Sequence, residues 1–85
     1  MTYRVKLHPK VTKFLKKLDN HIEERIREKL HLLHHDPFHY LEHYESENCY
    51  KFRIGDYRTL IDINKQRKLV FVRVLNHRKN IYKKK

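Results

Sequence analysis

Apolar residues near the start of the chain recur first with a period of two and then with the period of a helix. Tyr3, Val5 and Leu7 alternate with charged residues, a pattern that predicts a strand with one buried face. Pro9 suits the first turn of a helix, and beyond it apolar residues recur every three or four positions opposite a row of lysines. The apolar positions of this stripe are Val11, Phe14, Leu15 and Leu18. We therefore expect a strand followed by a short helix over residues 9 to 18.

A second helical stripe follows directly. Asn20, with Glu23 three positions later, resembles a capping box, which would start a helix at this point. The stripe continues through Ile22, Ile26, Leu30 and Leu33. The helix should end near His35, because Asp36 precedes Pro37 and is disfavoured in the α region.

From residue 50 onward the period changes to two, and three β-rich runs follow one another. They cover residues 50–54, 57–63 and 68–75. The gaps between them are short enough to be hairpin turns, so the runs predict a three-stranded antiparallel meander. Residues 69–72 are apolar at every position, which indicates a strand that is covered on both faces or central in the sheet. Residues 36–48, between the helices and the meander, show no readable pattern.

These elements predict an α+β fold with the order β-α-α-β-β-β. A tight turn at Asp19-Asn20 would make the two helices an antiparallel hairpin. This hairpin would cover one face of a twisted four-stranded sheet made by the N-terminal strand and the meander, and the other face would stay partly open to a ligand. Because a chain of 85 residues buries only about 60% of its unfolded surface, we expect one domain over residues 1–85.

Charge is the strongest signal in the composition. The chain carries a net charge of +11, with twelve Lys or Arg against two acids after residue 50. Like charges at this density repel one another, and the usual partner that offsets them is a polyanion such as nucleic acid or a strongly acidic protein. A membrane surface fits less well, because neither helix combines a basic face with a large aromatic one.

The expected compartment follows from cysteine usage and hydropathy. Cys49 is the single cysteine, so no disulfide can form within the chain, which is typical of a protein in a reducing compartment. No apolar run of signal-peptide length, about 7 to 15 residues, opens the chain. No run approaches the length of about 20 residues that spans a bilayer. We expect a cytoplasmic protein that does not enter a membrane.

Basic residues on the last strands form the candidate site. Lys51 and Arg53 lie two apart in a strand, so they share a face and should lie opposite Phe52 and its apolar neighbours. Arg58 lies just across the next turn. Further candidates follow at the end of the last strand and beyond it: Arg73, His77, Arg78, Lys79 and Tyr82. Solvation of an ordinary surface would also account for these cations.

The residue types suit a bent RNA phosphate. Arginine can donate two parallel hydrogen bonds to a phosphate, and cleavage through the 2′-hydroxyl needs a base, an acid and nearby cations but no metal. Tyr82 offers a ring on which an unstacked base could pack. The spacing of His31, His34 and His35 invites a metal, but it completes no ligand pattern, and histidines near a helix end also complement the helix dipole. We expect no metal site and no cofactor.

Three stretches of the sequence together resemble a known family. They are Gly55-Asp56-Tyr57-Arg58-Thr59-Leu60-Ile61, Val72-Arg73-Val74-Leu75-Asn76-His77-Arg78, and Ile81-Tyr82. With the order of elements and the length, they resemble the RelE/ParE superfamily of type II toxin–antitoxin toxins, and its RelE branch in particular. The resemblance implies a ribosome-dependent endoribonuclease that cleaves mRNA in the decoding site and is silenced by an acidic, RelB-like antitoxin.

The resemblance also implies catalytic roles for five residues. Lys51 would help to activate the 2′-hydroxyl, and Arg53 and Arg58 would stabilise the phosphorane. Arg78 would assist the leaving oxygen, and Tyr82 would orient the nucleotide.

Three further points complete this assignment. The best-known pattern has Lys at the position of Arg53, and because an arginine keeps its proton, Arg53 can hold charge but is a poor base. His77 is a further candidate acid or base, because imidazole titrates near neutrality. Arg73 and Lys79 would add contacts to the RNA.

Two other functions stay open. The ParE branch shares the fold but acts on DNA gyrase, and a non-catalytic member would bind only its antitoxin, with or without RNA. Lys51 and Tyr82 favour the RNA-cutting branch.

Overall fold

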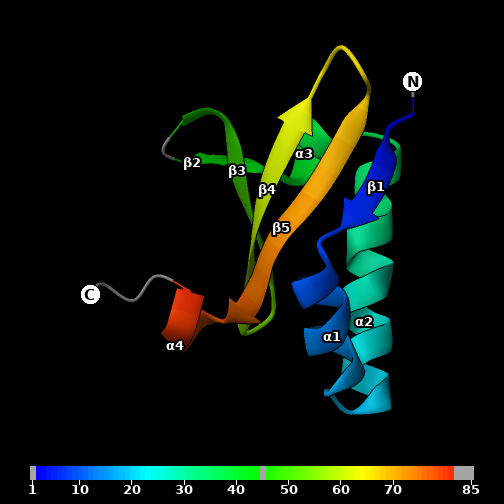
Figure 1. Cartoon of the computed structure of the whole chain (residues 1–85), viewed down its shortest axis with the longest axis vertical. Helices are drawn as coiled ribbons and strands as arrows, with labels where there is room; N and C mark the ends of the chain where they lie inside the picture. The colour runs from blue at the N-terminus through cyan, green and yellow to red at the C-terminus, as the bar shows by residue number, and fades with distance from the viewer. Residues whose placement is uncertain (1, 45, 82–85) are drawn as a thin grey trace.

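The computed structural model describes residues 2–44 and 46–81, and its strands form one mixed five-stranded sheet (Figure 1). The order across the sheet is β1, β5, β4, β3, β2. The strands are β1 (Arg4–Leu7), β2 (Glu42–Tyr44), β3 (Ser46–Ile54), β4 (Tyr57–Asn64) and β5 (Leu69–His77). The helices are α1 (Pro9–Lys16), α2 (Asn20–His31), the 3-10 turn η1 (Leu32–His34), α3 (Pro37–Tyr40) and α4 (Arg78–Ile81).

The predicted meander is confirmed, and the predicted strand count is wrong. Strands β3, β4 and β5 pair antiparallel in chain order. Strand β1 lies parallel to β5, which requires the long connection that the intervening elements provide. The fifth strand, β2, pairs antiparallel with β3 and lies inside residues 36–48, where no pattern was readable. Because β2 has only three residues, it is too short to show a period of two.

Both predicted helices form, but the predicted cap of the second is wrong. The His8 side chain caps α1 by accepting a hydrogen bond from the Lys10 N–H at 3.0 Å. At the start of α2, the cap position is occupied by Asp19 instead of the predicted Asn20, and the Asp19 side chain makes no cap hydrogen bond. Glu23 accepts instead from the Arg27 guanidinium at 3.0 Å, an i,i+4 pair that draws the carboxylate away from the helix start.

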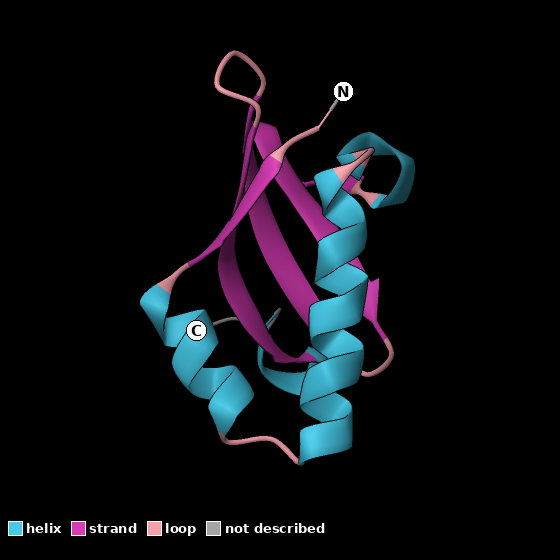
Figure 2. Cartoon of the chain, turned by 90° about the vertical axis from the view of Figure 1, so that its right-hand side faces the viewer, coloured by secondary structure: helices cyan, strands magenta, loops and turns pink. Residues whose placement is uncertain are grey.

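The two longer helices cover one face of the sheet. In Figure 2, α2 passes in front of the strands and α1 lies to its left, at the lower end of the sheet. Their apolar stripes pack on the sheet in one core, in which Leu15, Ile61, Val70 and Val72 have no exposed surface. Burial of such a side chain contributes about 1.5 to 3 kcal/mol. The opposite face of the sheet, called the open face below, is turned away from α1 and α2, as the sequence predicted.

A bulge in β5 changes which of its residues reach the open face. The β4–β5 register shifts between Leu60 and Ile61, whose partners are Val74 and Val72, so Arg73 is an extra residue between them. Buried positions on β5 are even-numbered before the bulge and odd-numbered after it. Beyond the bulge, even-numbered residues of β5 therefore turn to the open face.

Candidate nucleic-acid interface

Three basic side chains of the predicted site share the open face of β3 and β4. Phe52 and Ile54 are buried in the core, at 7% and 3% exposure, so Lys51 and Arg53 lie on the open face. The register pairs Arg53 directly with Arg58 of β4, and cross-strand partners share a face. The structure thus brings Lys51, Arg53 and Arg58 to one surface, as their spacing predicted.

Arg58 is held in place by the turn between β3 and β4. Its Nη1 donates to the Gly55 carbonyl oxygen at 2.8 Å and to the Tyr57 carbonyl oxygen at 3.1 Å. Gly55 has a φ of 60°, which glycine adopts at little cost, and this allows the tight turn. Arg53 and Arg58 repel each other across the strands, and an anion bound between them would offset that repulsion. The pair is therefore suited to a phosphate.

Lys51 lies where β3 pairs with the edge strand β2. Its Nζ is 3.7 Å from Oε1 of Glu42, its cross-strand partner, and 5.5 Å from the centre of the Tyr44 ring. The Lys51 side chain is 33% exposed and that of Glu42 is 73% exposed, so this ion pair contributes little to stability. The pair does orient the ammonium group. Sequence reasoning missed Glu42 as a neighbour of Lys51, because no pattern revealed β2.

Arg73, another predicted RNA contact, is paired with an acid. Its Nε donates to Oδ2 of Asp62 at 2.9 Å, and its Nη2 lies 3.2 Å from the Cys49 sulfur. Burial lowers the pKa of Arg73, but the hydrogen bond to Asp62 and the charges of Asp62 and Cys49 together outweigh burial, so the pKa rises overall. Asp62 thus offsets much of the charge that Arg73 would offer to RNA.

The end of β5 approaches the turn that holds Arg58. The Arg78 N–H donates to the Asp56 carbonyl oxygen at 2.9 Å, so α4 begins beside this turn, and the Arg78 side chain is exposed. The cross-strand partner of Arg58 on β5 is Asn76, which the sequence analysis did not single out as a site residue. Tyr82 lies outside the described residues, and its role stays a prediction.

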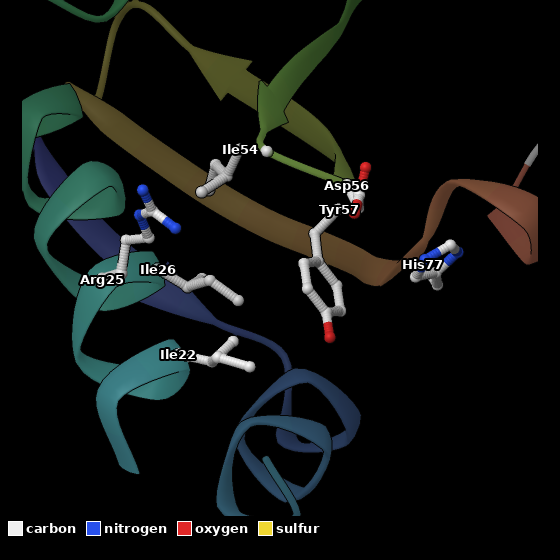
Figure 3. Close-up of a pocket in the computed structure, with 8 residues that line it drawn as sticks. Ile22, Arg25, Ile26, Ile54, Asp56, Tyr57 and His77 are labelled. Atoms are coloured by element: carbon white, nitrogen blue, oxygen red, sulfur yellow. The ribbon is translucent and has the colours of Figure 1, made fainter. Parts of the chain in front are cut away.

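His77 turns toward the helix-covered side of the sheet. It pairs with Tyr57, and the two rings lie 5.6 Å apart. Its Nδ1 accepts from the Lys79 N–H at 3.3 Å, at the start of α4, and Lys79 itself is exposed. Both rings line a cavity of about 300 Å³ between α2 and the β3–β4 turn (Figure 3). His77 and Arg58 therefore lie on opposite faces, although the sequence analysis grouped them at one site.

The histidines at the end of α2 lie ring against ring. His31 and His34 stack with 5.7 Å between ring centres, and His34 lies 5.2 Å from His35. Across residues 2–44 and 46–81, no three His, Cys, Asp or Glu side chains come together in a way that could hold a metal ion. In that same part of the chain, no helix is both long and apolar enough to cross a bilayer.

Solved toxin structures share this arrangement over nearly the whole chain. A chain of the archaeal RelE–RelB complex from Pyrococcus horikoshii is 30% identical, with a TM-score of 0.82, and the match covers 94% of this chain and 99% of that one. A chain of the RelB–RelE antitoxin–toxin complex from Methanococcus jannaschii is 25% identical, with a TM-score of 0.68, over 91% and 94%. A mutant of E. coli RelE in the free state shares the fold at 20% identity, with a TM-score of 0.77, over 95% and 88%.

The sequence itself also matches a protein family. Residues 5–81 fit the family of the ParE toxin of the type II toxin–antitoxin system parDE, whereas curated proteins give no significant match. Fold and sequence together define a toxin of a type II toxin–antitoxin system. The chain belongs to the RelE/ParE superfamily, and its structure is RelE-like.

Proposed function

We propose that this toxin cuts mRNA on the ribosome through the 2′-hydroxyl next to the scissile phosphate. The observation that carries the proposal is the Arg53–Arg58 pair on the open face, with Lys51 on the same strand beside it. Cations on an uncovered sheet surface can surround the phosphate of a bent RNA strand and offset its charge. These three side chains would hold the phosphate at which the strand is cut.

Arginine side chains would stabilise the pentacoordinate phosphate. Arg58 is already oriented by two carbonyl oxygens of its turn, so it needs little reorganisation when negative charge develops. Arg53, directly opposite, would donate to another oxygen of the same phosphate. Arg78 starts α4 beside this turn and would stabilise the negative charge on the leaving oxygen, which would take up a proton from water.

Lys51 would activate the 2′-hydroxyl. Arginine keeps its proton at physiological pH, so Lys51 is the residue of this group that can take the proton of the 2′-hydroxyl, and it would do so as the neutral amine. His77 was the other candidate for proton transfer, but it pairs with Tyr57 on the helix-covered side of the sheet. We assign His77 a structural role instead, in which its Nδ1 accepts the Lys79 N–H at the start of α4. Lys79 would contact RNA, and Tyr82 would stack on a base as the family resemblance implies.

The cognate antitoxin would be an acidic protein. Two of the similar structures are complexes that contain RelE and RelB. The net charge of +11 favours a partner of opposite charge, and such a partner would keep RNA away if it covered the Arg53–Arg58 pair. We place the toxin in the cytoplasm, where its proposed target is translated.

Incubation of the purified toxin with ribosomes that carry a defined message tests the proposal. We expect cuts within the codon in the A site, and no cuts in the same message without ribosomes. An intact message in the presence of ribosomes and folded toxin would contradict the proposal.

DNA gyrase is the second candidate target, because the matching family is that of the ParE toxin. The same preparation is incubated with gyrase and supercoiled DNA. Gyrase-linked DNA breaks without cuts in the message would favour this branch. Absence of both activities would favour a member that only binds its antitoxin.

A further inference from the structure

A notch opens at the edge of the sheet beside the proposed phosphate site. Strand β3 runs on to Ile54, but its pairing with β2 reaches only to the Glu42–Lys51 pair, so the last part of β3 extends past β2. Helix α3, just before β2, brings Tyr40 alongside this stretch. The notch has a volume of about 240 Å³ and is lined by Tyr40, Glu42, Lys51, Phe52 and Arg53.

Tyr40 forms an exposed aromatic wall of the notch. Its surface is 39% exposed, which is high for a large aromatic side chain. Its ring meets the buried ring of Phe52 edge-on, with 6.3 Å between centres, and meets His39 edge-on at 4.8 Å. These contacts orient the ring. An oriented, exposed ring is a platform on which an unstacked base can pack.

The polar wall of the notch fits one RNA base better than the others. Glu42 offers carboxylate acceptors 3.7 Å from the ammonium donor of Lys51. A carboxylate repels phosphate, so this wall is unsuited to the backbone of RNA but can accept hydrogen bonds from a base. Guanine carries two neighbouring donors, at N1 and N2, beside the acceptor O6. Glu42 would accept from these two donors with its two carboxylate oxygens, and Lys51 stays available for the 2′-hydroxyl.

We propose that the notch binds the guanine base of a nucleotide next to the scissile phosphate, stacked on Tyr40 and recognised by Glu42. This inference rests on the proposed function, because it makes the notch the specificity subsite of the same RNA-cutting surface. Lys51 and Arg53 line the notch and also lie on the open face. A phosphate at the Arg53–Arg58 pair and a base in the notch can therefore belong to one short stretch of RNA.

Cleavage of messages that differ only in the A-site codon tests the proposal. The codons place each of the four bases in turn on either side of the cut, and single-turnover rates are measured on ribosomes. The toxin should cut at guanine about tenfold faster than at adenine in the same position, the discrimination expected of one good contact to a base. Glu42→Gln keeps the shape of the side chain but replaces one acceptor by a donor, and it should bring this ratio close to one.

Three further variants separate base recognition from a general change in charge. Tyr40→Leu removes the flat ring and should slow cleavage about tenfold at all four bases, because stacking does not depend on the identity of the base, whereas Tyr40→Phe should retain the wild-type rates. Glu28→Gln removes the same charge from an exposed position on α2 and should leave the ratio unchanged. If Glu42→Gln changes the rates at all four bases equally, Glu42 acts through its charge alone and the proposal is wrong.

A binding measurement distinguishes failure of this inference from failure of the proposed function. The free toxin is titrated with a short RNA that lacks the attacking 2′-hydroxyl and carries guanine, adenine or hypoxanthine at the tested position. Hypoxanthine lacks the N2 amino group, so the wild-type toxin should bind the hypoxanthine RNA more weakly than the guanine RNA, and Glu42→Gln should bind the two equally. This result supports the notch even if the ribosome assay shows no cuts. Cleavage with no base preference would overturn the notch and leave the proposed function intact.

Discussion

Arg58 shows how a single side chain connects the fold to the proposed chemistry. Two carbonyl oxygens of its own turn bind the guanidinium, and the same turn accepts the Arg78 N–H through Asp56. The side chain has therefore lost much of its rotamer freedom before any RNA arrives. Ordering a long side chain costs up to about 2 kcal/mol, and here folding has already met that cost.

Replacement of Arg58 by Ala should remove activity without unfolding the toxin. We expect cleavage on ribosomes to fall by about 10² to 10³, because one lost donor to a developing charge has an effect of that size. The melting temperature should change little, since the side chain bonds only to turn carbonyls on the open face. Arg67→Ala in the β4–β5 turn is the matched control, and equal activity of the two variants would argue against the assignment.

The facing arginines predict a gain of stability when one charge is removed. Arg53→Gln should raise the free energy of unfolding by about 0.2 to 1 kcal/mol at low salt, since like charges opposite each other destabilise a strand pair. The gain should shrink as salt screens the repulsion. Urea denaturation at two salt concentrations measures the effect. Arg53→Lys retains the charge and should show no gain; a loss of stability in Arg53→Gln at low salt would contradict the repulsion.

At the scale of elements, the short pieces of this chain depend on what they pack against. Helix α1 has eight residues, fewer than an isolated helix needs to be stable in water, and strand β2 has three. Burial of Val11 and Leu15 against the sheet holds α1, and the ladder to β3 holds β2. The notch exists because β2 is shorter than β3, so its geometry depends on that ladder.

The packing of α1 can be tested at Leu15, which has no exposed surface. Leu15→Ala should lower the free energy of unfolding by about 2 to 5 kcal/mol, the usual effect of such a change in a core. Lys16→Ala, one position along on the exposed side of the helix, should change it by less than about 0.5 kcal/mol. Chemical denaturation compares the two variants, and similar values for both would contradict the packing described for α1.

Periodicity accounts for the elements that were predicted and for those that were missed. The stripe around Leu15 and the alternation around Phe52 each extend over enough residues to specify a helix and a strand. The Arg73 bulge gives no local signal, because an extra residue in a strand is defined only by its partner. The sequence therefore predicted the face on which Arg58 lies, whereas the face on which His77 lies follows only from the bulge.

For the whole molecule, the net charge of +11 should make the proposed binding of RNA, or of an acidic antitoxin, strongly dependent on salt. The cations are not equivalent, however. Arg73 is paired with Asp62 and Lys51 with Glu42, whereas Arg53 and Arg58 face each other. Removal of one facing arginine should therefore affect RNA binding more than removal of a distant lysine.

Salt titration of RNA binding measures this difference. The slope of log K against log salt for a non-cleavable single-stranded RNA should become less steep by about 0.7 in Arg58→Ala, the change expected when one phosphate contact is lost. Lys16→Ala on α1, the opposite side of the sheet, should leave the slope unchanged. The same slope change in both variants would indicate binding to the overall charge and not to the open face.

By itself, the sequence determined the order of the main elements, the face on which Lys51, Arg53 and Arg58 lie, and the preference for an anionic partner. These properties follow from periodicity within each element and from composition, which are local or additive. Only the tertiary structure decided that Glu42 meets Lys51, that His77 turns away, and that a notch opens beside Tyr40. Those features depend on strand register, a bulge and the length of an edge strand, which are set by pairing between segments distant along the chain.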